Sequence, residues 1–177
     1  DNGVTVCQVG EGADELFCGY PIWKMKLILQ QLNNLPIPNS LKKIGLHGMS
    51  LFGKKEKHYY EWLRRGANNL PIFWGGSEGL NEERKTLVFS ERMKDQFSNY
   101  KSWDSIKSIH RRYIDNGGSR SNGLKWMSYL DLNLRLPELL LMRVDKMSMG
   151  VSLESRVPFL DHKFVELSMG IPCLLYT

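Results

Sequence analysis

The chain has 177 residues, which suits one domain of the usual ~100–200 residues, and 42% of them are hydrophobic. Its composition excludes a mainly disordered chain, and no apolar run approaches the roughly 18 residues of a membrane helix. The formal net charge is +5. Three scattered cysteines are too few for a disulfide framework or a zinc site, and the N-terminus lacks a signal-peptide pattern, so we expect a cytoplasmic protein.

The first third of the chain predicts one strand and several helices. Residues 4–9 are short and β-branched and end at a glycine, which indicates a buried strand. A helix is expected to begin at Ala13, to break near Gly19 and Pro21, and to resume over residues 22–32, where apolar residues recur at helical spacing. Residues 33–53 carry several prolines and glycines and predict a loop with short helical pieces.

The remaining segments predict further helices. We expect helices over residues 59–67, after Asn81 as N-cap, and after Ser102 or Asp104 as N-cap. A turn is expected within residues 70–80, and a helix over residues 124–134 is expected to close near Pro137. No other stretch predicts a strand as clearly as residues 4–9. The predicted class is therefore α/β, with this chain mostly α-helical and with one clear strand.

The last segments combine apolar and charged residues. Residues 139–149 are apolar but carry Arg143, Asp145 and Lys146, which we interpret either as an internal ion-pair set or as part of a cleft. The methionines of this segment are expected to fill the core. Residues 157–160 are expected to be extended, and Asp161 is expected to cap a final helix that ends near Gly170.

The strongest chemical signal is the segment that follows the predicted strand, Gly10-Glu-Gly-Ala-Asp-Glu-Leu-Phe-Cys-Gly-Tyr20. A Gly-x-Gly turn between a strand and a helix exposes backbone N–H groups that bind anions. Glu11, Asp14 and Glu15 would repel phosphate unless a divalent cation such as Mg²⁺ lay between them. This acidic turn (residues 10–20) therefore indicates a nucleotide or pyrophosphate site, or else acids that merely offset the helix dipole.

The acidic turn resembles the Ser-Gly-Glu-Gly-x-Asp-Glu-x-Phe-x-Gly-Tyr signature of the asparagine synthetases. The stretch 136–149, Leu-Pro-Glu-Leu-Leu-Leu-Met-Arg-Val-Asp-Lys-Met-Ser-Met, resembles a second signature of the same family. Residues 152–162, Ser-Leu-Glu-Ser-Arg-Val-Pro-Phe-Leu-Asp-His, continue that resemblance. Two long motifs in this order are specific, although residues 33–120 match only in their helical character.

The resemblance implies an adenine-nucleotide α-hydrolase-like parallel sheet in the complete domain. It also implies a synthetase of the ATP-pyrophosphatase type, joined in one chain to a glutaminase domain. Such an enzyme activates aspartate with ATP as a β-aspartyl-adenylate, and ammonia from glutamine then forms asparagine. A homodimer is compatible with this family.

The same resemblance assigns roles to residues of the acidic turn. Asp14 would hold Mg²⁺ bound to pyrophosphate, and Gly10 and Gly12 would let the backbone approach the phosphates. Glu11 would lie beside the acceptor and help to deprotonate the attacking ammonia. Glu15 would shape the cleft.

Charged residues near the second signature are expected to shape the same cleft. Glu154 and Arg156 stand on either side of Ser155 and would share one face of an extended segment, which favours an ion pair there. Asp145 and Lys146 are assigned the same cleft-shaping role.

The chain also departs from the family pattern. Val9 replaces the family's serine, and the Ser-Gly-Gly-x-Asp-Ser loop that binds ATP is not in the sequence. Neither the glutaminase nucleophile nor the family's downstream lysine segment is present. We therefore expect residues 1–177 to be part of one synthetase domain and to be inactive alone.

The sequence is also compatible with other functions. Val9 leaves room for a relative that amidates or cyclises another carboxylate. Residues 1–20 hold four acids and no Lys or Arg, whereas the densest basic stretch runs from Lys42 to Arg65. That stretch could make the chain a non-catalytic module for a partner or polyanion, but basic runs are more often solvated, and no nucleic-acid motif accompanies it. A purely structural helical domain is the third alternative.

Overall fold

The computed structural model describes residues 3–76, 78–119 and 122–171. In chain order its elements are β1 (Val6–Gln8), α1 (Ala13–Phe17), α2 (Pro21–Asn33), α3 (Asn39–Leu51), α4 (His58–Ala67), α5 (Glu82–Val88), α6 (Glu91–Gln96), α7 (Ser102–Asp115), α8 (Gly123–Asn133), the π-helical η1 (Leu136–Leu141), α9 (Met142–Met149), β2 (Glu154–Arg156), the 3₁₀ turn η2 (Pro158–Leu160) and α10 (His162–Gly170). Helices dominate and the two strands pair in parallel. The mostly helical α/β class is confirmed.

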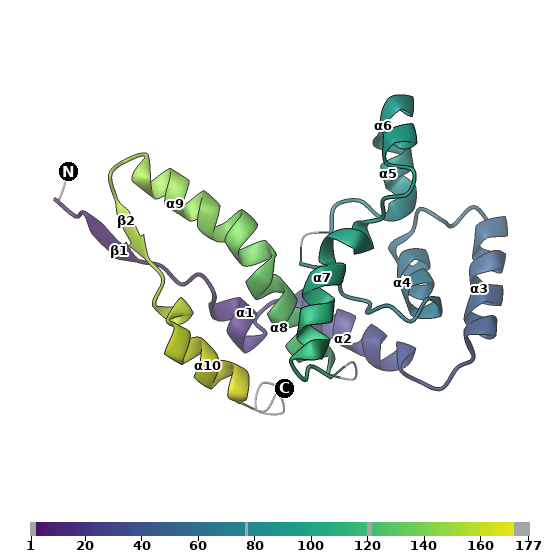
Figure 1. Cartoon of the computed structure of the whole chain (residues 1–177), viewed down its shortest axis with the longest axis horizontal. Helices are drawn as coiled ribbons and strands as arrows, with labels where there is room; N and C mark the ends of the chain where they lie inside the picture. The colour runs from purple at the N-terminus through teal and green to yellow at the C-terminus, as the bar shows by residue number, and fades with distance from the viewer. Residues whose placement is uncertain (1–2, 77, 120–121, 172–177) are drawn as a thin grey trace.

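The strand pair lies at one end of the molecule, beside α9 and α10, whereas α3 and α4 form the opposite end (Figure 1). Helices α1, α2 and α8 lie between these ends and connect them. The acidic turn leads directly from β1 into α1, so it lies where the strand pair meets the helical body.

The hydrophobic core lies where α2, α7 and α8 meet the segment 70–76. Its buried members are largely aromatic: Trp23, Phe73, Trp74, Ile106, Tyr113, Leu124, Trp126, Met127 and Leu130. The indole N–H of Trp126 donates to the carbonyl of Phe73 at 2.9 Å, which satisfies two buried polar groups and fixes the segment against α8. The predicted turn at residues 70–80 therefore also supplies core side chains.

A buried ion-pair network links α2, α4 and the segment after it. Arg65, 3% exposed, lies 3.0 Å from the Glu61 carboxylate and 2.6 Å from that of Glu78. Lys26 lies 3.1 Å from the second oxygen of Glu78. Each buried charge thus meets an opposite charge, as burial requires. Periodicity did not predict this network, because its members come from three separate segments.

Several predicted helix starts are confirmed. The Asn81 side chain accepts from the N–H of Arg84 at 2.8 Å at the start of α5, and Asp161 accepts from Lys163 at 3.0 Å at the start of α10. At α7, Asp104 accepts from the N–H of Lys101 at 2.8 Å, while Ser102 is already the first helical residue. Neither predicted N-cap is therefore right, because Lys101 is the N-cap of α7 and Asp104 is its third helical residue.

The structure corrects the prediction for residues 33–53. Instead of a loop with short helical pieces, residues Asn39–Leu51 form the continuous helix α3. Its two internal glycines weaken it only modestly, about 1 kcal/mol each, and packing against α4 outweighs that cost.

Of the two boundaries expected near the second signature, one is confirmed and one is wrong. The helix over residues 124–134 closes near Pro137 as predicted: α8 ends at Asn133, and Pro137 lies in the first turn of η1. Residues 157–160 are not extended: Pro158 starts η2, and the N–H of Leu160 donates to Val157 at 3.0 Å.

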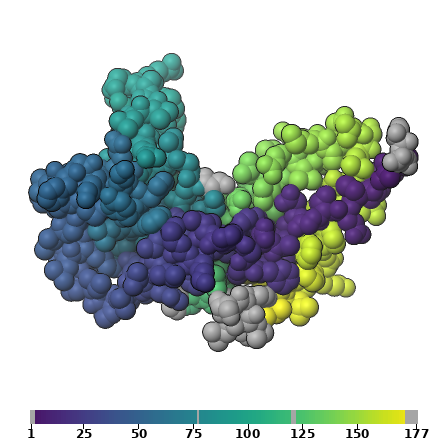
Figure 2. Space-filling view, turned by 180° about the vertical axis from the view of Figure 1, so that it is seen from behind, coloured from purple at the N-terminus to yellow at the C-terminus, as the bar shows by residue number. Residues whose placement is uncertain are grey.

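Several of the apolar residues whose spacing predicted α2 are exposed. On α2 the exposed side carries Ile22, Met25, Ile28 and Leu32, and Figure 2 shows α2 lying across the face seen from behind. The opposite side of α2 is buried, because Trp23 enters the aromatic core and the polar groups of Lys26 and Gln30 find partners there.

The strand and the methionines, which were expected to be buried, are more exposed than predicted. β1 is shorter than predicted and alternates between exposed and half-buried residues, since within the described ranges it has one neighbouring strand. Met142, Met147 and Met149 are exposed on α9 rather than packed in the core. Cys7 has a free thiol, and Cys173 lies outside the described residues.

Candidate functional site

The parallel strand pair brings the two family signatures together. Val6, Cys7 and Gln8 of β1 lie opposite Glu154, Ser155 and Arg156 of β2. The N–H of Val9 donates to the carbonyl of Arg156 at 2.9 Å, which extends the pairing to the start of the acidic turn. The carboxyl ends of both strands therefore lie at the same edge, the place where ligands bind in open α/β sheets.

Gly12 allows the acidic turn to pack against the segment that follows β2. Its φ of +94° is a left-handed conformation that glycine adopts readily, and it directly precedes α1. A Cβ at this position would overlap the Leu160 side chain. Gly10, by contrast, has no neighbouring atom within 4 Å of where a Cβ would be. The turn thus packs against Leu160 at Gly12, whereas the space beside Gly10 is empty.

The three carboxylates of the acidic turn have different surroundings. Asp14 is exposed and Glu11 is half-buried, and within the described ranges neither side chain has a hydrogen bond or ion pair. Glu15 is buried, and its carboxylate accepts from the Tyr20 hydroxyl at 2.7 Å. Two carboxylates are therefore available to a ligand, and the third anchors the turn to the core.

The surroundings of Tyr20 explain this anchoring. Burial, together with the hydrogen bond to the Glu15 carboxylate, raises the pKa of Tyr20 far above its ordinary value. The hydroxyl thus stays protonated and remains a donor. The Arg135 guanidinium, between α8 and η1, lies 4.4 Å from the centre of the Tyr20 ring and makes a cation–π contact with it.

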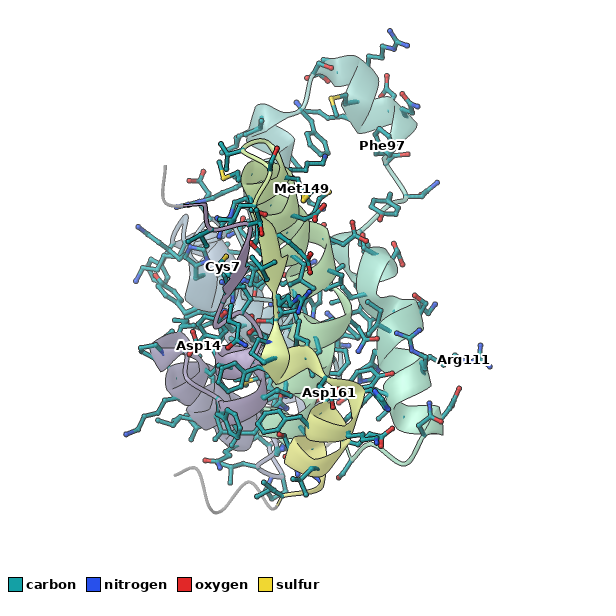
Figure 3. The ribbon with its side chains drawn as sticks, turned by 90° about the vertical axis from the view of Figure 1, so that its left-hand side faces the viewer. Cys7, Asp14, Phe97, Arg111, Met149 and Asp161 are labelled. Carbon is teal, nitrogen blue, oxygen red and sulfur yellow. The ribbon has the colours of Figure 1, made fainter. Side chains whose placement is uncertain are left out.

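The residues of the turn suit Mg²⁺ only in combination with phosphate. Among the described residues, no group of three His, Cys, Asp or Glu side chains is arranged around a common metal position. Mg²⁺ is commonly held by one or two carboxylates together with substrate phosphates. The free carboxylate of Asp14 at the sheet edge (Figure 3) fits such a shared site and does not form a closed one.

The ion pair predicted between Glu154 and Arg156 is confirmed. Arg156 Nε donates to Glu154 Oε1 at 2.7 Å, as two residues on one face of a strand allow. Their side chains are 64% and 55% exposed, so solvent screens the pair and its contribution to stability is small. Between them, Ser155 Oγ lies 3.6 Å from Cys7 Sγ on the neighbouring strand.

The structure contradicts one of the two interpretations of the charged trio of α9, the internal ion-pair set. Arg143, Asp145 and Lys146 are exposed, and within the described chain no ion pair joins them to one another or to other residues. The reason is that α9 lies at the edge of the molecule and buries none of its side chains. The expectation of an internal ion-pair set was therefore wrong.

Sequence reasoning missed a buried polar cluster beneath the acidic turn. Asp131 is fully buried; its Oδ1 accepts from the N–H of Gly76 at 3.2 Å and its Oδ2 lies 3.5 Å from Arg135. Burial raises the pKa of Asp131 to about 6. Ser128, also on α8, donates to the carbonyl of Glu15 at 2.7 Å. The four-residue spacing of Asp131 and Arg135 was the one available signal, because it places both on one helix face.

Together, the parallel strand pair and the helical body define a mostly helical α/β chain. A family model described as asparagine synthase matches residues 1–176. The chain belongs to the asparagine synthase family.

Individual relatives agree with this family. The chain is 34% identical over 177 residues to asparagine synthetase [glutamine-hydrolyzing] 1 of Bacillus subtilis (strain 168), a match that covers 98% of this chain and 26% of that protein. It is 29% identical over 183 residues to putative asparagine synthetases [glutamine-hydrolyzing] of Mycobacterium bovis and Mycobacterium tuberculosis, covering 96% of this chain and 24% of each relative. The chain thus spans about a quarter of the length of these relatives. No solved structure matches it at a significant level.

Within the described ranges, no helix combines the length and the apolar character that crossing a membrane requires.

Proposed function

We propose that this chain forms part of the synthetase domain of an ATP-dependent, glutamine-hydrolysing asparagine synthetase. The observation that carries the proposal is the junction at the carboxyl edge of the strand pair. There the acidic turn, with two unpaired carboxylates, packs through Gly12 onto the segment that follows β2. Family membership of residues 1–176 supports the same conclusion.

In this proposal the acidic turn binds the pyrophosphate part of ATP. Gly10, which has open space beside it, and Gly12, whose left-handed φ shapes the turn, let the backbone approach the phosphates, and Asp14 would hold Mg²⁺ together with them. Glu11, half-buried beside the turn, accepts a proton from the attacking ammonia. When bound, Mg²⁺ would neutralise phosphate charge, while the chain itself supplies orientation and the proton acceptor.

The surrounding charges shape the cleft. Glu15 anchors the turn through Tyr20, and the Glu154–Arg156 pair borders it on β2. Asp145 and Lys146 stay in the proposal as exposed charges of α9, which packs along β2. Their contribution would show as a changed KM for substrate after neutralisation in the complete enzyme.

The complete reaction would pass through a β-aspartyl-adenylate, with ammonia supplied by a glutaminase domain of the same protein. We propose that residues 1–177 form no asparagine alone, because they carry one part of the phosphate site. A cytoplasmic location and a homodimer complete the proposal. Val9, which presents no hydroxyl next to the turn, favours a second candidate: a relative that amidates or cyclises a different carboxylate.

Pyrophosphate binding by the 177-residue chain tests the acidic turn. We expect calorimetry to detect binding that requires Mg²⁺ and that is lost in Asp14→Asn. The matched control is Asp95→Asn, which removes an exposed carboxylate from α6, remote from the turn in Figure 1. Equal binding by the Asp14 and Asp95 variants would refute the role of Asp14.

Asparagine formation tests the wider proposal. The 177-residue chain, supplied with ATP, Mg²⁺, aspartate and ammonia, is expected to release no asparagine. Measurable turnover would contradict the partial-site argument. For the complete protein, a screen of carboxylate acceptors by pyrophosphate release would distinguish aspartate from another acceptor.

A further inference from the structure

A large cavity lies away from the acidic turn, in the helical body. It is open to solvent on one side and is lined by the end of α2, the start of α3, the segment before Phe73, α7 and the start of α8. Its volume of about 760 Å³ falls within the range of small-molecule sites. None of its lining residues belongs to the acidic turn or to the strands, so the proposed pyrophosphate site does not account for it.

The charges around this cavity are mainly positive. Lys42, Lys107 and Arg111 line it from two helices, and among the described lining residues the single acidic one is Asp115, 3.7 Å from Arg111. Lys42 bonds to oxygens of Asn33 at 2.8 and 3.0 Å and has no carboxylate partner within the described ranges. Lys107 has neither a hydrogen bond nor an ion pair there. The cavity thus has a positive charge that the chain does not neutralise.

The amide groups of the cavity act mainly as donors. The side-chain oxygens of Asn33, Asn34 and Asn69 each accept a hydrogen bond, from a lysine ammonium or from another amide, at 2.8–3.2 Å. Their NH₂ groups remain as donors, as do the ammonium groups at the rim. A ligand that satisfies these groups must therefore be rich in acceptor oxygens.

The remaining wall is apolar. Leu35, Ile37, Leu70 and Trp103 are among its lining residues. Charge-assisted hydrogen bonds to oxyanions are the strong ones, and apolar surface favours a ligand that also carries a hydrophobic body. We propose that this cavity binds a small organic anion, with its phosphate or carboxylate at the Lys42–Lys107–Arg111 rim and its apolar body against Leu35, Leu70 and Trp103.

Matched probes separate the two halves of this proposal. We would titrate the 177-residue chain by calorimetry with 1-naphthyl phosphate, 1-naphthoate and the neutral 1-naphthalenemethanol. Both anions are expected to bind at least about tenfold more tightly than the alcohol, since one charge-assisted hydrogen bond accounts for such a factor. The tighter of the two anions identifies the preferred head group. Equal binding of anions and alcohol, or no saturable binding of either anion, would overturn the proposal.

Charge reversal locates the site. Lys107→Glu/Arg111→Glu is expected to weaken binding of the anions at least about tenfold. The control Lys43→Glu/Lys55→Glu makes the same change of charge at exposed lysines outside the cavity and should leave the affinity within about twofold. If both doubles weaken binding equally, the attraction is non-specific and the proposal fails.

Two further variants keep the result interpretable. Lys107→Ala, which alters one exposed side chain, should weaken anion binding even if the double reversal does not fold, and unchanged affinity would count against the rim. Asp14→Asn should leave naphthyl phosphate binding unchanged, because the acidic turn is a separate site. Loss of that binding in Asp14→Asn would place the anion at the turn and overturn the proposal.

Discussion

Arg65 is the residue whose removal should most clearly reveal the buried ion-pair network. It reaches the carboxylates of Glu61 and Glu78, donates to the carbonyl of Ile72 at 2.7 Å, and lies 3.8 Å from the centre of the Trp74 ring. Arg65→Met keeps a long apolar side chain but removes every one of these polar contacts.

The cost follows from what is left behind. Removing one partner of a buried ion pair costs about 3–5 kcal/mol, because the other charge stays buried. Here Glu61 keeps Arg64 as a partner and Glu78 keeps Lys26, whereas the Ile72 carbonyl loses its side-chain donor. We therefore expect the lower end of that range, about 3 kcal/mol.

Urea unfolding followed by tryptophan fluorescence measures this loss. A change of about 3 kcal/mol is a large part of the 5–15 kcal/mol that stabilises a typical domain, and it corresponds to a fall in Tm of about 6–12 °C. Arg64→Met is the matched control, since Arg64 contacts the same Glu61 but its side chain is 25% exposed, and it should cost about 1 kcal/mol or less. If both variants lose the same stability within about 0.5 kcal/mol, burial does not determine the strength of the network.

Three further predictions concern single positions. Burial raises the folded-state pKa of Asp131 to about 6, above its ordinary 3.8, so the stabilisation from binding a proton is complete below pH 3.8 and is lost as the pH rises towards 6. Over this window Asp131→Asn should gain stability relative to the wild type, by at most about 3 kcal/mol, as measured by urea unfolding at a series of pH values. A difference that stays constant with pH would contradict the burial argument. Gly12→Ala should lower the free energy of unfolding by about 2 kcal/mol or more, because it combines a positive φ with an overlap at Leu160. The double variant Gly12→Ala/Leu160→Ala should recover part of this loss in thermal unfolding, and no recovery would refute the overlap. Asp161→Ala should cost about 1 kcal/mol by loss of the α10 cap, whereas Asp161→Asn should retain most of it, and equal losses in urea would show that the cap is unimportant.

What the sequence predicted correctly is mostly local. Asn81 and Asp161 cap helices through contacts within three residues, and Glu154 and Arg156 pair across a single intervening residue. The acidic turn was found from its glycines and acids, which lie within a few residues of one another. Such contacts depend on backbone geometry alone, so spacing predicts them.

What it failed to predict depends on contacts between distant segments. Nothing near Glu15 reveals that its carboxylate turns into the core, and Asp131 is buried because Gly76, 55 residues away, offers its N–H. The apolar spacing of α2 predicted the helix but not which of its sides is buried. The buried side holds Lys26, whose partner Glu78 lies 52 residues along the chain. Helix periodicity carries no information about such partners.

The distribution of buried side chains has a consequence for how firmly the acidic turn is supported. The aromatic core holds α2, α7 and α8, whereas α9 and η2 contain no buried residue and α10 buries Ser168 alone. Elements with few buried contacts open locally at a lower free energy than the core does. Amide hydrogens of β1, β2 and α9 should therefore exchange with solvent deuterium sooner than those of α8. A ligand that bridges the acidic turn and the segment after β2 would slow that exchange, and so would stiffen the end of the molecule where it binds.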